Sequence, residues 1–578
     1  MPKTLEEYTK EELIEVIKNL KRRKKFGLVW EDKAEEVVRQ VKTELPVIEE
    51  VASRAIDKVK DAATNFIIEG DNYYSLSTLN YTHTGRVDVI YIDPPYNTGN
   101  KDFIYEDRYI DREDTYRHSK WLSFMSKRLL LAKELLANTG IVFISIDDNE
   151  LSNLRLLCDG IFGSDNFIGT LPRVTKKSGK QHSGDVANNH DYVLVYVKNK
   201  PLAKFRGIEL DDDKYPLSDE YENERGKYKL NQTLDYDSLF YNPAMDYAID
   251  YEGQTFVPGG DIDKQKARHS GDHKNIDWVW RWSLAKFRFG AENGFVVIKK
   301  GKNGSRLYTK TYSRATITKN NGSYVVEYLK RENNLSSIAF VDNKYSNDNA
   351  KKELAAVLPG ISFDYPKPSV LISDLLRIVA KQDALVLDFF AGSGTTGQAV
   401  LNINKEDGGN RRFILCTNNE NGIAENITYQ RVKNVVDGYA KIKGIPANLR
   451  YFKTALVSKQ QTDDQTRIEL VARSTDMICL REDAFEKVID TKLFKVFGNV
   501  YHYAAIVFEA EAIVLLKDSL AKLKDDKPIH IYVFSLSNDT YESDFADLER
   551  EHELRPIPES ILEVYRRIHK AQGEELGL

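Results

Sequence analysis

The chain has 578 residues, of which 41% are hydrophobic and 30% are charged, and its formal net charge is −5 at neutral pH. This length and composition are typical of a soluble globular protein of several domains with ample core. The mild acidity excludes a uniformly basic surface, so contacts with nucleic acid would need local basic patches, and no apolar run reaches the roughly 18 residues of a membrane span.

The beginning of the chain and its cysteines both favour a cytoplasmic protein. The first residues, Met-Pro-Lys-Thr-Leu-Glu-Glu, do not have the form of a signal peptide. Cys158, Cys416 and Cys479 are too far apart in sequence for a paired zinc motif, and we predict no metal site. Scattered single cysteines fit a reducing compartment, and we therefore expect a cytoplasmic location.

Residues 1–60 are predicted to form helices, because a capping box and an apolar face extend to Leu20. The basic run 21–25 follows. A solvated helix end is its simpler interpretation, and contact with DNA phosphates or a partner is the alternative. A strand near residue 66 then leads into a Gly-Asp turn, where Asp71 can cap the next helix.

A buried strand from Val87 to Ile92 ends abruptly in Asp93-Pro94-Pro95-Tyr96. Two prolines fix φ and remove two backbone donors, so this turn is stiff. It presents a carboxylate, a carbonyl acceptor and a flat ring at the carboxyl end of a strand, where open α/β sheets bind ligands. An exocyclic amino group on a planar base would suit these groups, whereas an isolated motif of this kind also fits an ordinary strand-ending turn.

Further sheet strands are predicted up to residue 200, near residues 142, 168 and 193. The segment from Arg173 to His182 contains four Lys or Arg residues and no acid. This charge, on a loop between two strands, favours contact with the DNA backbone over a plain surface loop.

Residues 201–358 differ in character, because Tyr, Asn, Asp, Gly and Lys become frequent and long apolar runs disappear. Aromatic residues alternate with arginines between Trp278 and Phe289. We expect the aromatic side chains to form mainly the core of a small domain, while Arg281 and Arg288 are candidates for contacts with bases.

A second buried strand ends at Asp388 and leads through a glycine turn into a helix. The turn lets a ligand approach the backbone closely, but it is not a phosphate loop, because no Lys-Ser or Lys-Thr follows the glycines. Gly397 has the spacing of the third glycine of a dinucleotide fingerprint, so the glycines alone do not exclude that alternative. The pattern Asp388-x-Phe390-x-Gly392-x-Gly394 favours an S-adenosylmethionine site instead.

The order of the two motifs, with Asp-Pro-Pro-Tyr first and Phe-x-Gly-x-Gly second, resembles the β class of DNA amino-methyltransferases. The resemblance is closest to the modification (Mod) subunit of Type III restriction–modification systems and covers residues 60–450 well. It implies that the catalytic residues are Asp93, Pro94, Pro95 and Tyr96. It implies that the cofactor-binding residues are Asp71, Asn72, Lys367, Pro368, Asp388, Phe390, Gly392, Gly394 and, where the family often has an acid for the ribose, Asn418.

The predicted fold is α/β, with a seven-stranded doubly wound sheet of the S-adenosylmethionine-dependent methyltransferase type and a circularly permuted motif order. The chain is expected to divide into an N-terminal helical segment (1–60), a catalytic half (61–200), an inserted target-recognition domain (201–358), a cofactor-binding half (359–450) and a small α/β C-terminal domain (451–578).

The activity that the resemblance implies is methyl transfer from S-adenosylmethionine to N6 of a flipped-out adenine in double-stranded DNA, with no metal required. It also implies a homodimer and a restriction (Res) partner with an ATP-dependent helicase and a nuclease. Because this sequence has no helicase-type phosphate loop, cleavage of DNA would require that other protein. A solitary DNA methyltransferase and a cytosine-N4 enzyme are the alternatives. The second is disfavoured because cytosine enzymes more often have Ser where Asp93 stands.

Overall fold

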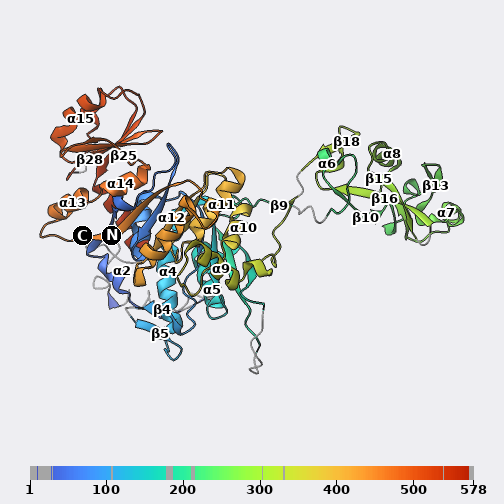
Figure 1. Ribbon diagram of the computed structural model, residues 1–578, viewed down its shortest axis with the longest axis horizontal. Helices are drawn as coiled ribbons and strands as arrows, with labels where there is room; N and C mark the ends of the chain where they lie inside the picture. Colours follow the sequence, from blue (N-terminus) through green and yellow to red (C-terminus); the bar gives the residue numbers. More distant parts are fainter. Residues whose placement is uncertain are drawn as a thin grey trace. The chain divides into compact units, whose positions relative to one another are not determined.

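The structure is a computed structural model that describes residues 9–10, 28, 30–105, 108–177, 186–209, 215–301, 304–329, 332–379, 381–537, 539 and 541–571. The chain divides into two compact units (Figure 1). Unit 1 comprises Met1–Phe205 and Ser336–Leu578, and unit 2 comprises Arg206–Leu335. The basic run 21–25 and loop residues 178–182 lie outside the described residues.

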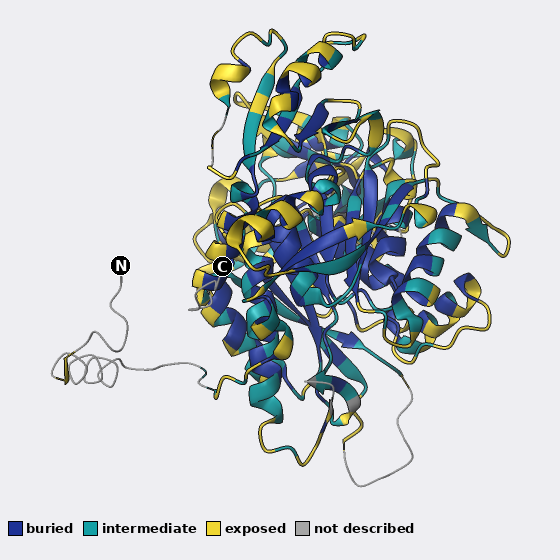
Figure 2. Ribbon diagram, turned by 90° about the vertical axis from the view of Figure 1, so that its left-hand side faces the viewer, coloured by how far each residue is buried: buried dark blue, intermediate teal, exposed yellow. Residues whose placement is uncertain are grey.

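Unit 1 is built around a nine-stranded sheet with the order β1-β24-β2-β21-β20-β3-β6-β8-β7. In this order the strands are Glu44–Glu50, Asn448–Ser458, Thr64–Glu69, Arg412–Thr417, Leu385–Asp388, Val87–Ile92, Leu136–Ile146, His190–Val197 and Phe167–Val174. The strands from β24 to β6 are mutually parallel, whereas β1 is antiparallel to β24, and β8 is antiparallel to both β6 and β7. Figure 2 shows the central strands buried beneath more exposed helices, which explains their continuous apolar sequences.

All seven predicted strands are present in this sheet, and the predicted fold class is confirmed. The sheet has two further strands, β1 and β24, which pair with each other. β1 lies in the segment that was predicted to be helical, of which α2 (Glu36–Gln40) is a described helix. β24 crosses the predicted boundary at residue 451. β1 was missed because it is a short apolar run between acids, and only its pairing with β24 identifies it as a strand.

Helices cover both faces of the sheet. One layer contains α9, α10, α11 and α12, which are Asn347–Val357, Ser369–Val379, Thr395–Asp407 and Tyr429–Asp437. The other contains α3, α4 and α5, which are Asn72–Thr82, Arg117–Leu135 and Leu151–Phe162. A Cβ on Gly397 of α11 would lie 3.1 Å from Leu415 and Val432. This third glycine therefore serves close packing of the helix on the sheet.

Unit 2 has a three-stranded sheet in the order β10-β16-β15, formed by Tyr228–Thr233, Gly304–Tyr312 and Val296–Gly301. Unit 2 also contains pairs of strands, which are Asp235–Phe240 with Ile276–Trp280, Ile249–Tyr251 with Gln254–Phe256, Ala315–Asn320 with Ser323–Tyr328, and Ile208–Glu209 with Glu332–Asn333. Its α-helices are Glu222–Arg225, Ile262–His269 and Leu284–Glu292. Trp280 and Phe287 are buried in its core, as predicted, and Arg288 is exposed. The predicted boundary at residue 358 is too late, because α9 belongs to unit 1, where Asn434 donates to the Val357 carbonyl at 2.9 Å.

The C-terminal part of unit 1 carries a second sheet of five strands in the order β25-β26-β27-β28-β29. These strands are Glu486–Asp490, Phe494–Gly498, Tyr503–Val507, Ile529–Phe534 and His552–Ile557, and the nearby helices α13 to α16 are Asp463–Ala472, Thr475–Glu482, Ile513–Leu520 and Glu559–Ala571. The expected α/β character is thus observed. Among the described residues, none of the helices combines the length and apolar composition that a bilayer crossing requires.

Candidate functional site

The two sequence motifs follow neighbouring strands. β3 pairs in parallel with β20, with Val89 opposite Val386 and Ile90 opposite Leu387. Because parallel strands end at the same edge of a sheet, the turn that starts at Asp93 and the glycine turn after β20 share that edge. The structure therefore brings together two motifs that are far apart in sequence.

The Asp-Pro-Pro-Tyr turn is fixed by buried side chains on two helical segments. Trp121 of α4 is fully buried and donates its indole N–H to the Pro95 carbonyl at 2.7 Å. Asn97, which is fully buried with a φ of 57°, donates through Nδ2 to Glu150 Oε1 at 2.5 Å. Asparagine tolerates this left-handed backbone better than most residues. The stiff turn is thus anchored in the middle and at its end.

The two carboxylate oxygens of Asp93 have different surroundings. Oδ2 accepts a hydrogen bond from Lys367 Nζ at 2.6 Å in an ion pair. Oδ1 is buried and has no hydrogen-bond partner among the described residues. A buried acceptor without a partner is costly and therefore rare, and it often marks a functional position. One oxygen of Asp93 thus has a hydrogen-bonding capacity that the described residues do not use.

Tyr96 lies beside this ion pair, with Lys367 Nζ 5.0 Å from the centre of its ring. The Tyr96 hydroxyl donates to Asp191 Oδ2 at 3.2 Å. Burial, reinforced by the negative charges of Asp191 and Asp93, raises the pKa of Tyr96 well above its usual value. The side chain therefore stays a neutral phenol held by its hydroxyl, with its ring next to Lys367.

Arg173 holds Asp191 in place. Its guanidinium is 1% exposed and donates to both Asp191 oxygens, and it also donates to the Tyr345 carbonyl at 2.7 Å. The predicted contact of Arg173 with the DNA backbone is therefore wrong, because a buried ion pair occupies this side chain. In the same segment, from Arg173 to His182, Lys177 is exposed and Lys176 is partly exposed.

Replacing Arg173 with methionine should lower the free energy of unfolding by about 3–5 kcal/mol, because Asp191 would remain buried without its cation. Arg377→Met is the matched control, since Arg377 forms its ion pairs on the surface and should contribute less than about 1 kcal/mol. Urea unfolding of both variants measures the difference. Equal stability of the two variants would show that the Arg173 ion pair does not hold the site.

The glycine turn after β20 uses backbone conformations that suit glycine. Gly392 has a φ of 48° and Gly394 has a φ of 75°. A Cβ on Gly392 would have its nearest neighbour, the Phe363 ring, at 3.5 Å, which is an ordinary contact distance. A Cβ on Gly394 would lie 3.2 Å from the Thr428 carbonyl oxygen. Gly394 thus serves internal packing, whereas Gly392 can admit a ligand close to the backbone.

Asp388 stabilises the turn from inside. Oδ1 accepts the Phe390 N–H at 3.0 Å, and Oδ2 accepts the Thr396 hydroxyl at 2.5 Å. Burial raises the pKa of Asp388 to about 7, although both hydrogen bonds oppose this shift. Both oxygens are therefore used within the protein, and the carboxyl group gains its proton near neutral pH.

This pKa predicts a pH dependence of stability. An aspartate in the unfolded chain has a pKa of about 4, so the folded state binds the proton more tightly than the unfolded state does. Proton binding therefore stabilises the folded state, and this contribution is lost as pH rises from about 4 to about 7. Asp388→Asn cannot ionise. As pH rises across this range, the free energy of unfolding of the variant should therefore increase relative to that of the wild type, by at most about 1.4 kcal/mol per pH unit. Urea unfolding at several pH values tests this, and a constant difference between the two proteins would contradict it.

Asp71 and Asn72 lie at the start of α3. Asp71 Oδ1 accepts the backbone N–H of the second helical residue at 2.7 Å, so the predicted capping is observed. Asn72 donates to the Phe389 carbonyl at 3.2 Å, which links α3 to the glycine turn. The fully buried Arg128 contacts both side chains and pairs with Glu35 at 2.6 Å. These contacts place Asp71 and Asn72 next to the glycine turn.

The other predicted cofactor residues are more dispersed. Lys367 and Pro368 are buried just before α10, and Lys367 reaches Asp93. Phe390 lies in the glycine turn, with its ring 5.9 Å from the ring of Phe124. Asn418 follows β21 and is exposed.

Sequence reasoning missed the supporting role of Arg128 and Asp191 and gave Arg173 a different role. All three are charged and almost fully buried. The one available signal was Asp191 at the start of an otherwise apolar strand, since a charge in such a position needs a partner. The sequence does not identify that partner.

Comparison with known proteins identifies the family of the chain. Residues 87–429 match the model of a family described as DNA methylase, and this region includes both motifs. This chain belongs to the DNA methylase family. The methylase is 32% identical over 401 residues to the Type II methyltransferase M.KpnI of Klebsiella pneumoniae, and the match covers 67% of this chain and 86% of the relative.

The methylase is also 32% identical over 401 residues to the Type III restriction-modification enzyme StyLTI Mod subunit of Salmonella typhimurium. That match covers 64% of this chain but only 55% of the Mod subunit. Among solved structures, the M1.HpyAVI–SAM complex matches 64% of this chain and 98% of its own, with 13% identity and a TM-score of 0.28. The predicted resemblance to DNA methyltransferases and Mod subunits is confirmed.

Proposed function

We propose that this methylase transfers a methyl group from S-adenosylmethionine to N6 of adenine in double-stranded DNA. The observation that carries this proposal is the buried, unpartnered Oδ1 of Asp93 at the sheet edge shared with the glycine turn. A carboxylate oxygen in this position fits an exocyclic amino group, which needs hydrogen-bond acceptors.

The amino nitrogen of adenine is a poor nucleophile, because its lone pair is delocalised into the ring. Asp93 Oδ1 and the Pro94 carbonyl accept its two N–H bonds and draw the nitrogen towards tetrahedral geometry. The carboxylate also stabilises the positive charge that develops on nitrogen during attack. The ion pair with Lys367 supports this role, because it holds Oδ2 and leaves Oδ1 available.

The target amino group is inaccessible inside a duplex, so the base must leave the stack at a cost of a few kcal/mol. The ring of Tyr96 stacks on the flipped base and recovers about 1–3 kcal/mol. Its hydroxyl, bound to Asp191, fixes the ring beside Asp93. S-adenosylmethionine supplies a methyl group that its sulfonium already activates.

The glycine turn fits this cofactor on structural grounds. A Cβ at Gly392 would meet only ordinary contacts, and Asn72 joins α3 to the same turn. Gly392, Phe390 and Asn72 would hold the cofactor, while Asp388 maintains the turn from inside. Asp71, Lys367, Pro368, Gly394 and Asn418 complete the proposed set, with Asp71 and Lys367 acting through their contacts with Arg128 and Asp93.

Unit 2 is the proposed target-recognition domain, with Arg288 as an exposed candidate for base contact. The names of the relatives support two settings for the enzyme. StyLTI Mod is a subunit of a Type III restriction-modification enzyme, which supports a partner subunit for this chain. We propose that this partner is a Res subunit with helicase and nuclease activities and that the methylase forms a homodimer. M.KpnI is a Type II methyltransferase, which supports an enzyme that methylates without being a subunit of a nuclease.

Incubation of the purified chain with radiolabelled S-adenosylmethionine and DNA, followed by analysis of the nucleosides, tests the proposed activity. The expected product is N6-methyladenine, and N4-methylcytosine would overturn the base assignment. Copurification of the tagged chain from its own cells separates the two settings. A large ATP-dependent nuclease in the complex supports the Type III setting, and its absence supports the other.

A further inference from the structure

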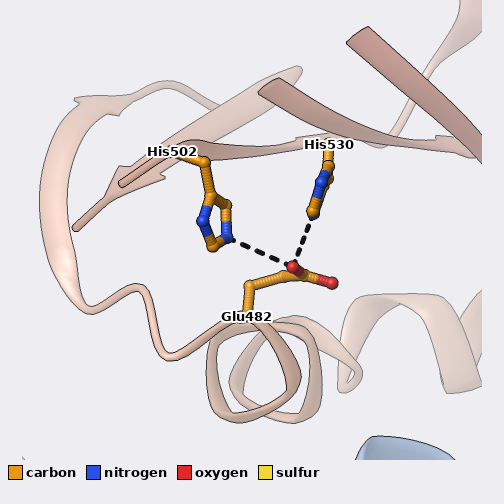
Figure 3. Close-up of side chains that lie close together, drawn as sticks. All are labelled: Glu482, His502 and His530. Atoms are coloured by element: carbon orange, nitrogen blue, oxygen red, sulfur yellow. Dashed lines mark hydrogen bonds and ion pairs between the residues drawn. The ribbon is translucent and has the colours of Figure 1, made fainter. Parts of the chain in front are cut away.

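A second cluster of chemically active side chains lies in the C-terminal part of unit 1. Glu482 is the last residue of α14, His502 immediately precedes β27, and His530 is in β28. His530 Nδ1 is 2.6 Å and His502 Nε2 is 3.2 Å from the same oxygen, Glu482 Oε2. Figure 3 shows both imidazoles pointing at this carboxylate. One ligand atom from each residue fits within 4.8 Å of the others.

The cluster is held in place by neighbouring hydrogen bonds. Asn499 donates through Nδ2 to the backbone carbonyls of Glu482 and Asp483, at 3.0 and 3.2 Å. Its side-chain oxygen accepts the backbone N–H of His502 at 2.9 Å. A single side chain thus connects the end of α14 to the loop that carries His502.

The surroundings orient the remaining groups. The Tyr532 hydroxyl donates to Glu482 Oε1, which leaves Oε2 for the histidines. His530 directs Nδ1 at Glu482, and its other ring nitrogen lies 3.8 Å from a Glu553 carboxylate oxygen. A carboxylate behind a histidine is a common arrangement around metal ions, because it fixes the tautomer and raises the basicity of the coordinating nitrogen.

Hydrogen bonding alone leaves this cluster incomplete. His502 Nε2 is buried and, among the described residues, makes no hydrogen bond, although it lies at ion-pair distance from Glu482. The two imidazole rings are only 4.7 Å apart, and Arg481 Nε lies 3.6 Å from Glu482 Oε1. One metal cation bound by both imidazoles and the carboxylate would satisfy these groups.

We propose that Glu482, His502 and His530 bind a zinc ion. Two imidazoles and one carboxylate match the nitrogen and oxygen ligands of three-residue zinc sites, in which a water takes the fourth position. The side chains of His502 and His530 are 18% and 28% exposed, so neither is fully enclosed by the protein. This set was not apparent in the sequence, because no cysteine takes part and the three ligands come from separate elements.

The proposed ion connects two parts of unit 1. α14 packs against α3 and β1 of the methylase sheet as well as against β27 of the C-terminal sheet. A zinc ion that joins α14 to β28 and the loop before β27 therefore fastens the C-terminal sheet to the main body. The proposal does not depend on methyl transfer, because the site lies in a separate sheet from the Asp93 turn.

Metal analysis of the purified, tag-free full chain tests the proposal. After incubation with Zn²⁺ and dialysis against buffer, the wild type should retain about one zinc per chain, whereas His502→Ala and His530→Ala should retain none. His552→Ala is the matched control, because His552 lies on the neighbouring strand β29 outside the cluster, and this variant should retain zinc like the wild type. Zinc-free wild type, or equal zinc in all four proteins, would overturn the proposal.

Two further measurements remain decisive if an alanine variant folds poorly. Co²⁺ added to the metal-free wild type should give the intense visible absorption of a four-coordinate ion and should be displaced by Zn²⁺. Tyr532→Phe keeps all three ligands and should weaken zinc binding by about 10- to 100-fold in competition with a chromophoric chelator. A weak six-coordinate Co²⁺ spectrum, or unchanged affinity in Tyr532→Phe, would contradict the proposed site.

Discussion

Asp93→Ala should reduce methyl transfer to DNA by about 100- to 1,000-fold or more, because it removes both the acceptor of the amino group and the charge that stabilises the transition state. Binding of S-adenosylmethionine should remain close to that of the wild type. The glycine turn is built by residues other than Asp93, which contacts Lys367. Radiolabelled methyl transfer and calorimetric binding of the cofactor measure the two quantities separately.

The variant leaves Lys367, which is 7% exposed, without its ion-pair partner, and this loss could destabilise the protein. Retained binding of the cofactor would show that the variant is still folded. Asp148→Ala is the matched control, because Asp148 is an exposed carboxylate just beyond β6, the strand next to β3. That variant should keep its activity. Asp93→Asn separates the two contributions of the carboxylate, since the amide retains an acceptor but lacks the charge. Normal turnover of Asp93→Ala would remove Asp93 from the mechanism.

Gly392→Trp should weaken S-adenosylmethionine binding by about 100-fold or more, which corresponds to a loss of about 3 kcal/mol. The physical reason is that a large side chain would occupy the side of the turn where we propose that the cofactor binds. The backbone at Gly392 has a φ of 48°, so the substitution also adds strain. Calorimetric titration with the cofactor gives the dissociation constant directly.

Gly408→Trp controls for that strain. Gly408 has a φ of 69° at the end of α11, and its Cβ would meet nothing within 4 Å. This variant should therefore bind the cofactor as the wild type does, with a similar loss of stability. If both variants bind normally, Gly392 does not line the cofactor site.

The fold could be predicted largely from the sequence because its central strands are continuous apolar runs. β3 and β20 are buried on both faces, and both end in turns whose composition is distinctive. The edge strand β1 was missed for the opposite reason. It is a short apolar run between acids, and its identity as a strand depends on pairing with residues about 400 positions away.

In the candidate site too, some residues could be predicted from local sequence patterns and others could not. Asp93 and Gly392 could be selected from local patterns, because each motif has its chemistry within a few residues. The pairing of Arg173 with Asp191 and the cluster of Glu482 with two histidines could not, because their partners come from different elements. A charged residue in a sequence does not show whether water or an opposite charge surrounds it, and only the fold decides between these.

The central claim is that the turns after β3 and β20 form one site that methylates adenine. The most direct test is single-molecule sequencing of DNA from cells that express either the wild-type chain or Asp93→Ala. We predict N6-methyladenine at one recurring sequence with the wild type and unmodified adenine at the same sequence with the variant. Equal adenine modification with both proteins, or modification of cytosine alone, would contradict this account.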